Sequence, residues 1–89
     1  MPWTLTKSPD YQATVQLLED SEQNKVNDWT NMVTGQNVDP LRAAGFLGYR
    51  IGPGPGTYME FYAGSYHRVF FTYDGTAREL RLEHVGHVR

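Results

Sequence analysis

The sequence predicts an α+β fold in which an N-terminal strand and a helical hairpin precede an antiparallel β-sheet. Three observations predict this class. Apolar residues recur at helical spacing between residues 9 and 35, they alternate with polar residues in three segments after residue 56, and Asp74-Gly75 separates the last two segments. A chain of 89 residues has room for one compact core. We therefore expect a single domain that covers residues 1–89.

Turn and capping residues define the first three elements. The segment "WTLTKS" at residues 3–8 alternates apolar and polar side chains, which is typical of a short strand. Ser8 followed by Pro9 indicates a helix start, because serine caps free N–H groups and proline fits the first helical position. Ser21 is the expected cap of a second helix, which Gly35 is expected to end in a left-handed conformation. We expect the two helices to pack as a hairpin.

Residues 36–56 are rich in turn formers, and only a short strand near residues 49–51 is expected there. The stretch "GPGPG" does not fit a phosphate-binding loop, because no Gly-Lys-Ser/Thr follows it. An exposed loop of restricted flexibility is the expected structure.

The rest of the chain is expected to form three antiparallel strands, at residues 57–62, 66–73 and 77–85. Asp74-Gly75 predicts a two-residue type I′ turn between the last two. That turn fixes the pairing of the flanking strands, because pairs run backward from it at a constant sum of residue numbers. The resulting register places Arg68 directly opposite Arg81 on one face of the sheet.

Two opposed guanidinium groups destabilise a sheet unless a negative charge lies between them. That charge is either a bound anion or the diagonal carboxylates of Glu79 and Glu83, and a solvated ladder of charges is the simpler alternative. The same alternation places His67 and His84 on the apolar face, as histidines at the edge of the core, and places His87 on the polar face. His87 is thus the stronger chemical candidate.

The chain is weakly acidic overall, and its charge is uneven along the sequence. The net charge is −2, yet residues 1–40 carry two lysines against six acidic residues and residues 41–89 carry six arginines against four. The overall balance argues against a nonspecific binder of nucleic acid. The arginines favour planar, bidentate contacts to phosphate or carboxylate groups.

Composition also suggests the compartment and the absence of cofactors. The sequence contains no cysteine, no signal-peptide pattern at its start and no apolar run long enough to span a membrane. We therefore expect a cytoplasmic protein without a membrane partner. No third ligand at a recognised spacing accompanies His84 and His87, so we expect neither a metal nor another cofactor.

Three short motifs carry a resemblance to a known family. They are "DPLR" at 39–42, "HRVFF" at 67–71 and "HVGHVR" at 84–89. Together with the expected order of elements, they resemble the RelE/ParE superfamily of bacterial toxins, especially its RelE, YoeB and HigB ribonuclease branches. The resemblance implies a RelE-like fold similar to that of microbial ribonucleases, cleavage of mRNA on the ribosome, and a cognate antitoxin protein that wraps over the toxin and neutralises it.

The resemblance also implies roles for individual residues. Arg68 matches the arginine at the start of the middle strand that contacts the scissile phosphate, and His87 matches the acid/base group near the C-terminus. Asp39 lies near the position of a carboxylate that some members use as a base. Arg42 matches a basic residue close behind that carboxylate.

Metal-independent cleavage of RNA needs a base for the 2′-OH proton, an acid for the 5′-oxygen and donors for the charge that develops on the phosphate. Asp39 or Glu60 is the candidate base, and His87 is the candidate acid. Tyrosines of the sheet are candidates for stacking an unpaired base. The candidate ligands of phosphate and RNA are Arg68, Arg81, Arg89, Arg42 and Tyr66.

The sequence departs from the family in two places. Many members have lysines on the first central strand, where this chain has Tyr58, Glu60 and Tyr62, and many continue to a tyrosine beyond the position of Arg89. Two further functions therefore stay open. One is a ParE-like inhibitor that binds DNA gyrase without catalysis, and the other is a catalytically inactive protein-binding module of the same fold.

Overall fold

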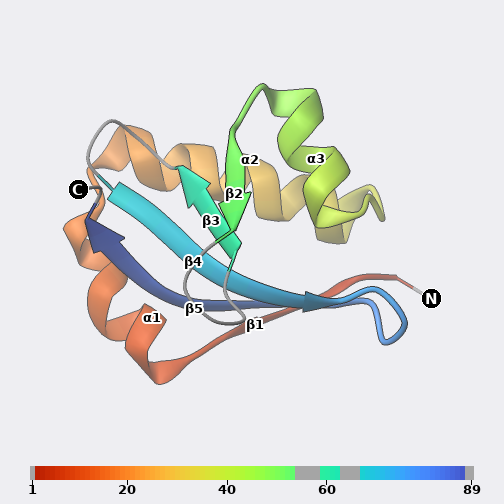
Figure 1. Ribbon diagram of the computed structural model, residues 1–89, viewed down its shortest axis with the longest axis horizontal. Coiled ribbons are helices and arrows are strands. Elements are labelled where there is room, and N and C mark those ends of the chain that lie inside the picture. Colours follow the sequence, from red (N-terminus) through yellow and green to blue (C-terminus); the bar gives the residue numbers. More distant parts are fainter. Residues whose placement is uncertain (1, 54–58, 63–66, 88–89) are drawn as a thin grey trace.

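The computed structural model describes residues 2–53, 59–62 and 67–87 and has the expected α+β architecture (Figure 1). Five strands form one mixed sheet in the order β1-β5-β4-β3-β2, in which β1 runs parallel to β5 and the other neighbours are antiparallel. The elements are β1 (Thr4–Lys7), α1 (Pro9–Thr14), a 3₁₀ turn η1 (Val15–Leu17), α2 (Asp20–Gly35), α3 (Pro40–Leu47), β2 (Ile51–Pro53), β3 (Met59–Tyr62), β4 (His67–Asp74) and β5 (Glu79–His87).

Helix α1 begins as the sequence predicts and completes the edge of the sheet. The Ser8 hydroxyl oxygen accepts a 3.0 Å hydrogen bond from the Tyr11 N–H, and Pro9 is the first helical residue. Strand β1 pairs with β5 only as far as Leu82. Beyond that point α1 supplies the partners, because the Ser8 hydroxyl donates to the Glu83 carbonyl and the Val85 N–H donates to Thr14 Oγ1 at 2.9 Å. These bonds satisfy backbone groups of β5 where β1 has ended.

The N-cap of helix α2 lies two residues before the expected one. Glu19 is the N-cap, and Glu19 and Glu22 exchange side-chain and backbone hydrogen bonds in a capping box. The prediction that Ser21 caps the helix is therefore wrong. Gly35 is the last helical residue, Gln36 follows with φ −106°, and the left-handed residue is Asn37 with φ 57°. The prediction that Gly35 adopts a left-handed conformation is therefore also wrong.

Helix α3 was not expected, because residues 36–56 read as turn formers. Asp39 caps it by accepting hydrogen bonds from the N–H groups of Leu41 and Arg42, and Gly48 ends it with φ 76°. Its eight residues include Gly45, which weakens the helical pattern in the sequence. The expected hairpin of the first two helices is wrong as well, because α2 packs against α3 while α1 packs against β5.

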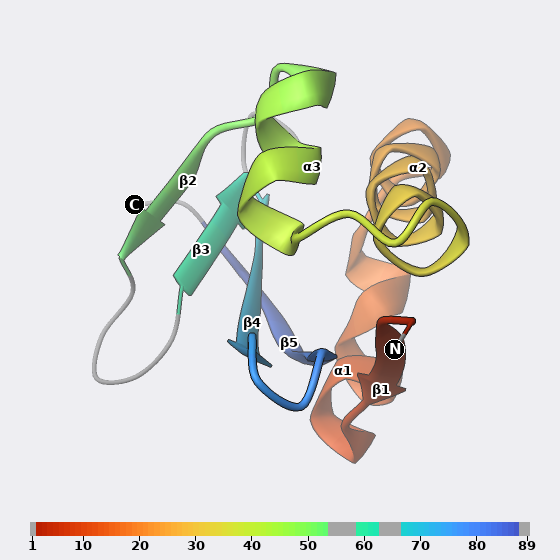
Figure 2. The ribbon, with the colours of Figure 1, turned by 90° about the vertical axis from the view of Figure 1, so that its right-hand side faces the viewer.

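Helices α2 and α3 lie together on one face of the sheet (Figure 2), and the core lies between them and the strands. Trp29 of α2 stacks on Phe61 at 4.3 Å between ring centres and meets Phe71 edge-on at 4.9 Å. Its indole N–H donates to the Pro40 carbonyl at 2.9 Å and so ties α2 to the start of α3. The fully buried side chains contributed by the strands are Phe61, Val69, Phe71, Leu80 and Leu82.

The hairpin of β4 and β5 has a longer loop and a different register from those predicted. Asp74 pairs with Glu79, so four residues rather than two connect the strands. Asp74 Oδ1 accepts hydrogen bonds from the N–H groups of Thr76 and Ala77, and Arg78 has φ 54°. The aspartate stabilises a longer turn through its side chain, which is why the type I′ prediction is wrong.

Strand β5 also contains one extra residue. Phe70 pairs with His84 and Phe71 pairs with Leu82, which leaves Glu83 in a β-bulge. A bulge reverses the alternation of side chains between the two faces of a strand. Leu82 and Val85 both point into the core, although three positions separate them.

No helix in the described part of the chain is both long enough and apolar enough to cross a membrane.

The double role of Ser8 gives a prediction about stability. Ser8→Ala removes the cap of α1 and the hydroxyl bonded to the Glu83 carbonyl, so we expect the free energy of unfolding to fall by about 1–2 kcal/mol. Urea unfolding followed by circular dichroism measures this change. Ser21→Ala is the matched control, because Ser21 is exposed and inside α2. Equal losses in the two variants would contradict the assignment.

Candidate functional site

The sheet face turned away from α2 and α3 carries the polar side chains of the central strands. We call this surface the outer face, and no helix in the described ranges covers it. Alternation along the strands and the bulge at Glu83 together decide its members. They are Glu60, Arg68, Phe70, Thr72, Arg81, Glu83, His84 and Gly86.

Arg68 and Glu60 form an ion pair on the outer face. Arg68 Nη1 lies 2.6 Å from Glu60 Oε2, and only 8% of Glu60 is exposed. The pair is diagonal across β3 and β4, since Glu60 faces Phe70 and Arg68 faces Tyr62. A charge-assisted bond of this length holds both groups in fixed positions. The guanidinium therefore lies beside a group that can accept a proton.

Arg81 has a different carboxylate as its partner. Its Nε lies 3.2 Å from Glu83 Oε2, and the same oxygen accepts a 2.9 Å hydrogen bond from the Thr72 hydroxyl. Arg81 faces Thr72, whereas Arg68 faces Gly86. Four residues of β4 separate these positions, about 13 Å along the strand.

The prediction that Arg68 and Arg81 face one another is therefore wrong, although both lie on the outer face. The longer loop and the bulge change the register by several residues. The structure therefore gives no reason to expect an anion between the two guanidinium groups. Arg68 is paired with Glu60, and Arg81 is paired with Glu83.

His84 lies on the outer face, not on the apolar face predicted for it. Its imidazole stacks on the Phe70 ring, with 4.5 Å between ring centres and 19° between planes. Gly86 makes room for this ring, because a Cβ atom at that position would lie 2.8 Å from Phe70 Cε2. Arg68 faces Gly86, so His84 is the diagonal neighbour of Arg68 at about 7–8 Å.

His84 is thus a candidate residue that the sequence-based argument did not select. The signal for its position was Gly86, since a glycine inside a strand often marks the close approach of another group. The sequence did not show which group approaches. The bulge places Phe70 across from His84, and the Phe70 ring can stack there because residue 86 has no side chain to block it.

His67 lies on the inner face, as predicted, and has a hydrogen-bond partner there. Its Nδ1 lies 3.0 Å from Glu22 Oε1 on α2. Burial alone would raise the pKa of Glu22. The hydrogen bonds from the Glu19 N–H and from His67 act in the other direction, as does the charge of Lys25, and together they hold the pKa of Glu22 below its ordinary value of 4.5.

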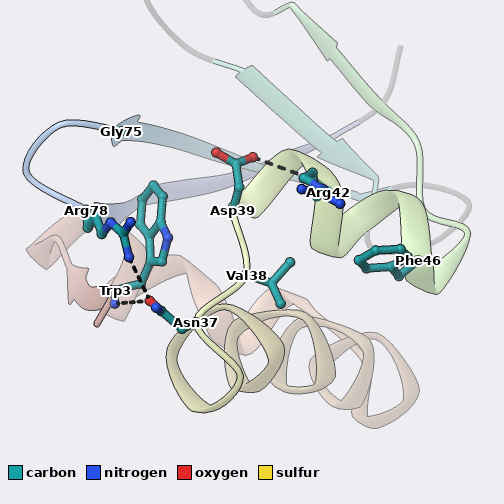
Figure 3. Close-up of a pocket in the computed structure, with 8 residues that line it drawn as sticks. All are labelled: Trp3, Asn37, Val38, Asp39, Arg42, Phe46, Gly75 and Arg78. Atoms are coloured by element: carbon teal, nitrogen blue, oxygen red, sulfur yellow. Dashed lines mark hydrogen bonds between the residues drawn. The ribbon is translucent and has the colours of Figure 1, made fainter. Parts of the chain in front are cut away.

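Asp39 and Arg42 are not brought together with Arg68. Both line a pocket at the start of α3 whose other described walls come from the N-terminal segment, the α2–α3 connection and the tip of the β4–β5 hairpin (Figure 3). None of the outer-face residues lines this pocket.

Three predicted site residues fall wholly or partly outside the described part of the structure. Tyr66 and Arg89 lie outside it altogether. The backbone of His87 pairs with His67 at the end of β5, but its side chain is outside the described atoms.

The outer face can bind an anion and move protons. Arg68 supplies donors for a phosphate oxygen, the carboxylate of Glu60 can accept a proton, and the ring nitrogens of His84 can donate or accept a hydrogen bond. Within the described ranges, no three histidine or acidic side chains are placed to hold a metal ion.

The Glu22–His67 contact gives a prediction about pH. Because the pKa of Glu22 is lowered by folding, its stabilising effect is present above the unfolded-state pKa and is lost as pH falls through the folded-state pKa. Glu22→Gln should therefore lower stability at neutral pH, and the gap to the wild type should close below about pH 4.5. Urea titrations over a pH series test this, with Asp28→Asn on the exposed side of α2 as control. A gap that persists in acid would assign the effect of Glu22 to packing.

The Gly86–Phe70 contact gives a prediction about the site. Gly86→Ala should push the Phe70 ring off His84, because the added methyl group would overlap the ring edge. Nuclear magnetic resonance should show the His84 ring protons losing the shift that a stacked aromatic ring produces. Gly45→Ala is the control, since nothing lies within 4 Å of a Cβ atom there. Unchanged His84 signals in Gly86→Ala would refute the stack.

Comparison with known proteins supports the fold. No protein-family model matches this sequence, and no curated protein matches it either. The chain is similar in structure to YafQ in the Escherichia coli DinJ–YafQ toxin–antitoxin complex, with a TM-score of 0.68, 17% identity, and coverage of 98% of this chain and 93% of that one. It is also similar to a histidine-to-glutamine mutant of E. coli YafQ, with a TM-score of 0.64, 17% identity, and coverage of 96% and 92%. The chain therefore has the RelE-like fold that the sequence resemblance implied.

Proposed function

We propose that this protein is the toxin of a toxin–antitoxin system and that it cleaves mRNA on the ribosome in the cytoplasm. The observation that carries the proposal is the outer face, where the Arg68–Glu60 pair lies diagonally beside the stacked His84. The fold shared with YafQ supports the class of function. The complex of YafQ with DinJ supports a cognate antitoxin as partner.

The proposed reaction needs no group beyond side chains of this chain. Glu60 takes the proton of the 2′-OH, whose oxygen then attacks the adjacent phosphorus. The bond from phosphorus to the 5′-oxygen breaks, and a histidine donates a proton to that oxygen. The products are a 2′,3′-cyclic phosphate and a 5′-hydroxyl, so atoms and protons balance. Each proton transfer by a positioned side chain contributes about 10²- to 10⁴-fold in rate.

Arg68 is the proposed ligand of the scissile phosphate. A phosphate would compete with Glu60 for the guanidinium, and a guanidinium has enough donors to bind both groups at once. The binding of phosphate beside Glu60 would bring the reacting 2′-OH close to the carboxylate. Arg81 lies farther along the same face and would contact a neighbouring phosphate.

Two histidines are candidates for the acid. His84 is supported by its place on the outer face next to Arg68, and by the ring of Phe70 that holds its plane. His87 is supported by the family resemblance and by its place at the end of β5. Asp39 is a less suitable base than Glu60, because it caps α3 in a separate pocket.

A non-enzymatic function is the second candidate. The carboxylates beside Arg68 and Arg81, and the net charge of −2, reduce the attraction of the outer face for RNA. An inhibitor that binds DNA gyrase, or an inactive binding module, would tolerate this arrangement better than a nuclease would.

Ribosome-dependent cleavage of mRNA by the purified protein distinguishes these functions. We expect the wild type to cleave, and Arg68→Ala and Glu60→Gln each to lose about 10²-fold or more because each removes a group that acts in the transition state. His84→Gln and His87→Gln identify the acid, since the variant that lacks it should lose more activity. Lys7→Ala removes one exposed positive charge on β1 and is the control.

Two results would contradict the proposal. Wild-type protein that does not cleave mRNA on ribosomes but inhibits supercoiling by gyrase would select the inhibitor. Full activity in both Arg68→Ala and Glu60→Gln would show that the outer face is not the site.

A further inference from the structure

The pocket at the start of α3 lies beside the tip of the β4–β5 hairpin, whereas His84 and Gly86 lie near the other end of β5. It opens between the N-terminal segment, the tip of the β4–β5 hairpin and α3 (Figure 3), and none of the outer-face residues lines it. Its volume is about 400 Å³, and pockets of about 300–1,000 Å³ hold small organic ligands. Its lining includes Trp3, Asn37, Asp39, Arg42, Phe46 and Arg78.

One end of the pocket offers an exposed aromatic ring. Phe46 is 67% exposed, more than any other large apolar side chain in the described ranges. The guanidinium carbon of Arg42 lies 5.9 Å from the centre of this ring. Arginine and aromatic planes together form a platform on which a flat heterocycle can stack. Because the Phe46 ring is mostly exposed and Arg42 lies beside it, this platform suits a planar ligand.

The middle of the pocket offers a hydrogen-bond acceptor. Asp39 Oδ1 accepts the bonds that cap α3, at 2.9 Å from the Leu41 nitrogen and 3.4 Å from the Arg42 nitrogen. Within the described part of the chain, no hydrogen bond uses Oδ2, and Figure 3 shows that oxygen turned away from the helix. Carboxylate oxygens accept from the exocyclic amino groups of nucleobases.

The other end offers a cation. Arg78 lies beside Trp3, and its Nη1 donates to Asn37 Oδ1 at 3.5 Å. Asn37 Oδ1 also accepts from the backbone N–H of Trp3 at 3.1 Å. The side-chain amide of Asn37 therefore holds the Arg78 guanidinium against the wall of the pocket. A guanidinium carries five N–H donors, so it can bind a phosphate in addition to the partners that it already has. The pocket thus has a platform, an acceptor and a cation in that order.

We propose that this pocket binds a nucleotide. The base stacks on Phe46 and Arg42, an amino group of the base donates to Asp39 Oδ2, and the phosphate contacts Arg78. An acidic peptide is a poorer occupant, because Asp39 would repel its carboxylates. The site is separate from the outer face, and it would give the protein a second point of contact with single-stranded RNA.

Nuclear magnetic resonance titrations with cytidine monophosphate and uridine monophosphate test the proposal. The two bases differ along one edge, because C4 carries an amino group in cytosine and a carbonyl oxygen in uracil, and N3 is an acceptor in cytosine and a donor in uracil. We expect both to move the indole N–H signal of Trp3 and not that of Trp29, which is fully buried under the sheet. We expect the cytidine nucleotide to bind more tightly, by about tenfold for one well-placed hydrogen bond to a charged acceptor. Absence of a Trp3 shift at a few millimolar ligand would overturn the proposal.

Three variants assign the parts of the site. Phe46→Leu keeps an apolar side chain but removes the ring, and Arg42→Gln removes the cation above it, so each should weaken binding by about tenfold. Asp39→Asn keeps the cap of α3 and replaces the acceptor by a donor, so it should reverse the preference and favour the uridine nucleotide. Lys7→Ala should leave binding unchanged. An unreversed preference in Asp39→Asn would remove Asp39 from the site.

Three further binding measurements show which ligand the pocket takes and whether binding depends on the proposed catalytic site. Inorganic phosphate alone should bind far more weakly than the nucleotide, because the platform and the acceptor add to its affinity. A short cytidine oligonucleotide that binds more tightly than the mononucleotide would identify RNA as the ligand, and equal affinity would identify a free nucleotide. Arg68→Ala should keep full nucleotide binding, so a failure of the cleavage proposal does not affect this one.

Discussion

The β-bulge at Glu83 is the constraint on which the functional surface of this protein depends. It inserts one residue into β5 between the pairs Phe71–Leu82 and Phe70–His84. Before the bulge, Leu82 points into the core, and after it the next inward residue is Val85. Side chains at the two ends of α1 hold the bulge, because the N-cap Ser8 hydroxyl donates to the Glu83 carbonyl and Thr14 Oγ1 accepts from the Val85 N–H. The imidazole of His84 reaches the outer face only because of this shift.

The outer face combines positive groups with close carboxylates, and this combination decides what it can do. An isolated guanidinium would attract any anion, whereas Arg68 bonded to Glu60 and Arg81 bonded to Glu83 present little net charge. Such pairs discriminate against weak or nonspecific ligands, because an incoming phosphate must match the geometry of the pair. The proposed recognition of RNA would therefore depend on the geometry of these pairs more than on net positive charge, since the chain carries a net charge of −2.

Two groups of polar residues lie toward opposite ends of the β4–β5 hairpin. The carboxylate and imidazole of the proposed reaction lie near His84, on the outer face. The tip of the β4–β5 hairpin and the start of α3 carry the aromatic platform, the acceptor and the cation of the pocket. The same sheet joins both ends rigidly. Asp39 and Arg42, both from the motif "DPLR", belong to the second group and line a pocket separate from Arg68.

The sequence by itself determined the fold class, the capped start of α1, the three strands of the antiparallel sheet and the inward position of His67, because periodicity and capping are local properties. It could not determine the pairing of β4 with β5. Asp74-Gly75 allowed a two-residue turn, and only the packed structure selected the longer loop in which the Asp74 side chain caps Thr76 and Ala77. The position of His84 depended on its long-range contact with Phe70, which no local pattern records. Helix α3 had local signals, Asp39-Pro40 at its start and Gly48 at its end, but the glycines and prolines around it favoured turns. Register is a property of two segments together, and tertiary packing decides it.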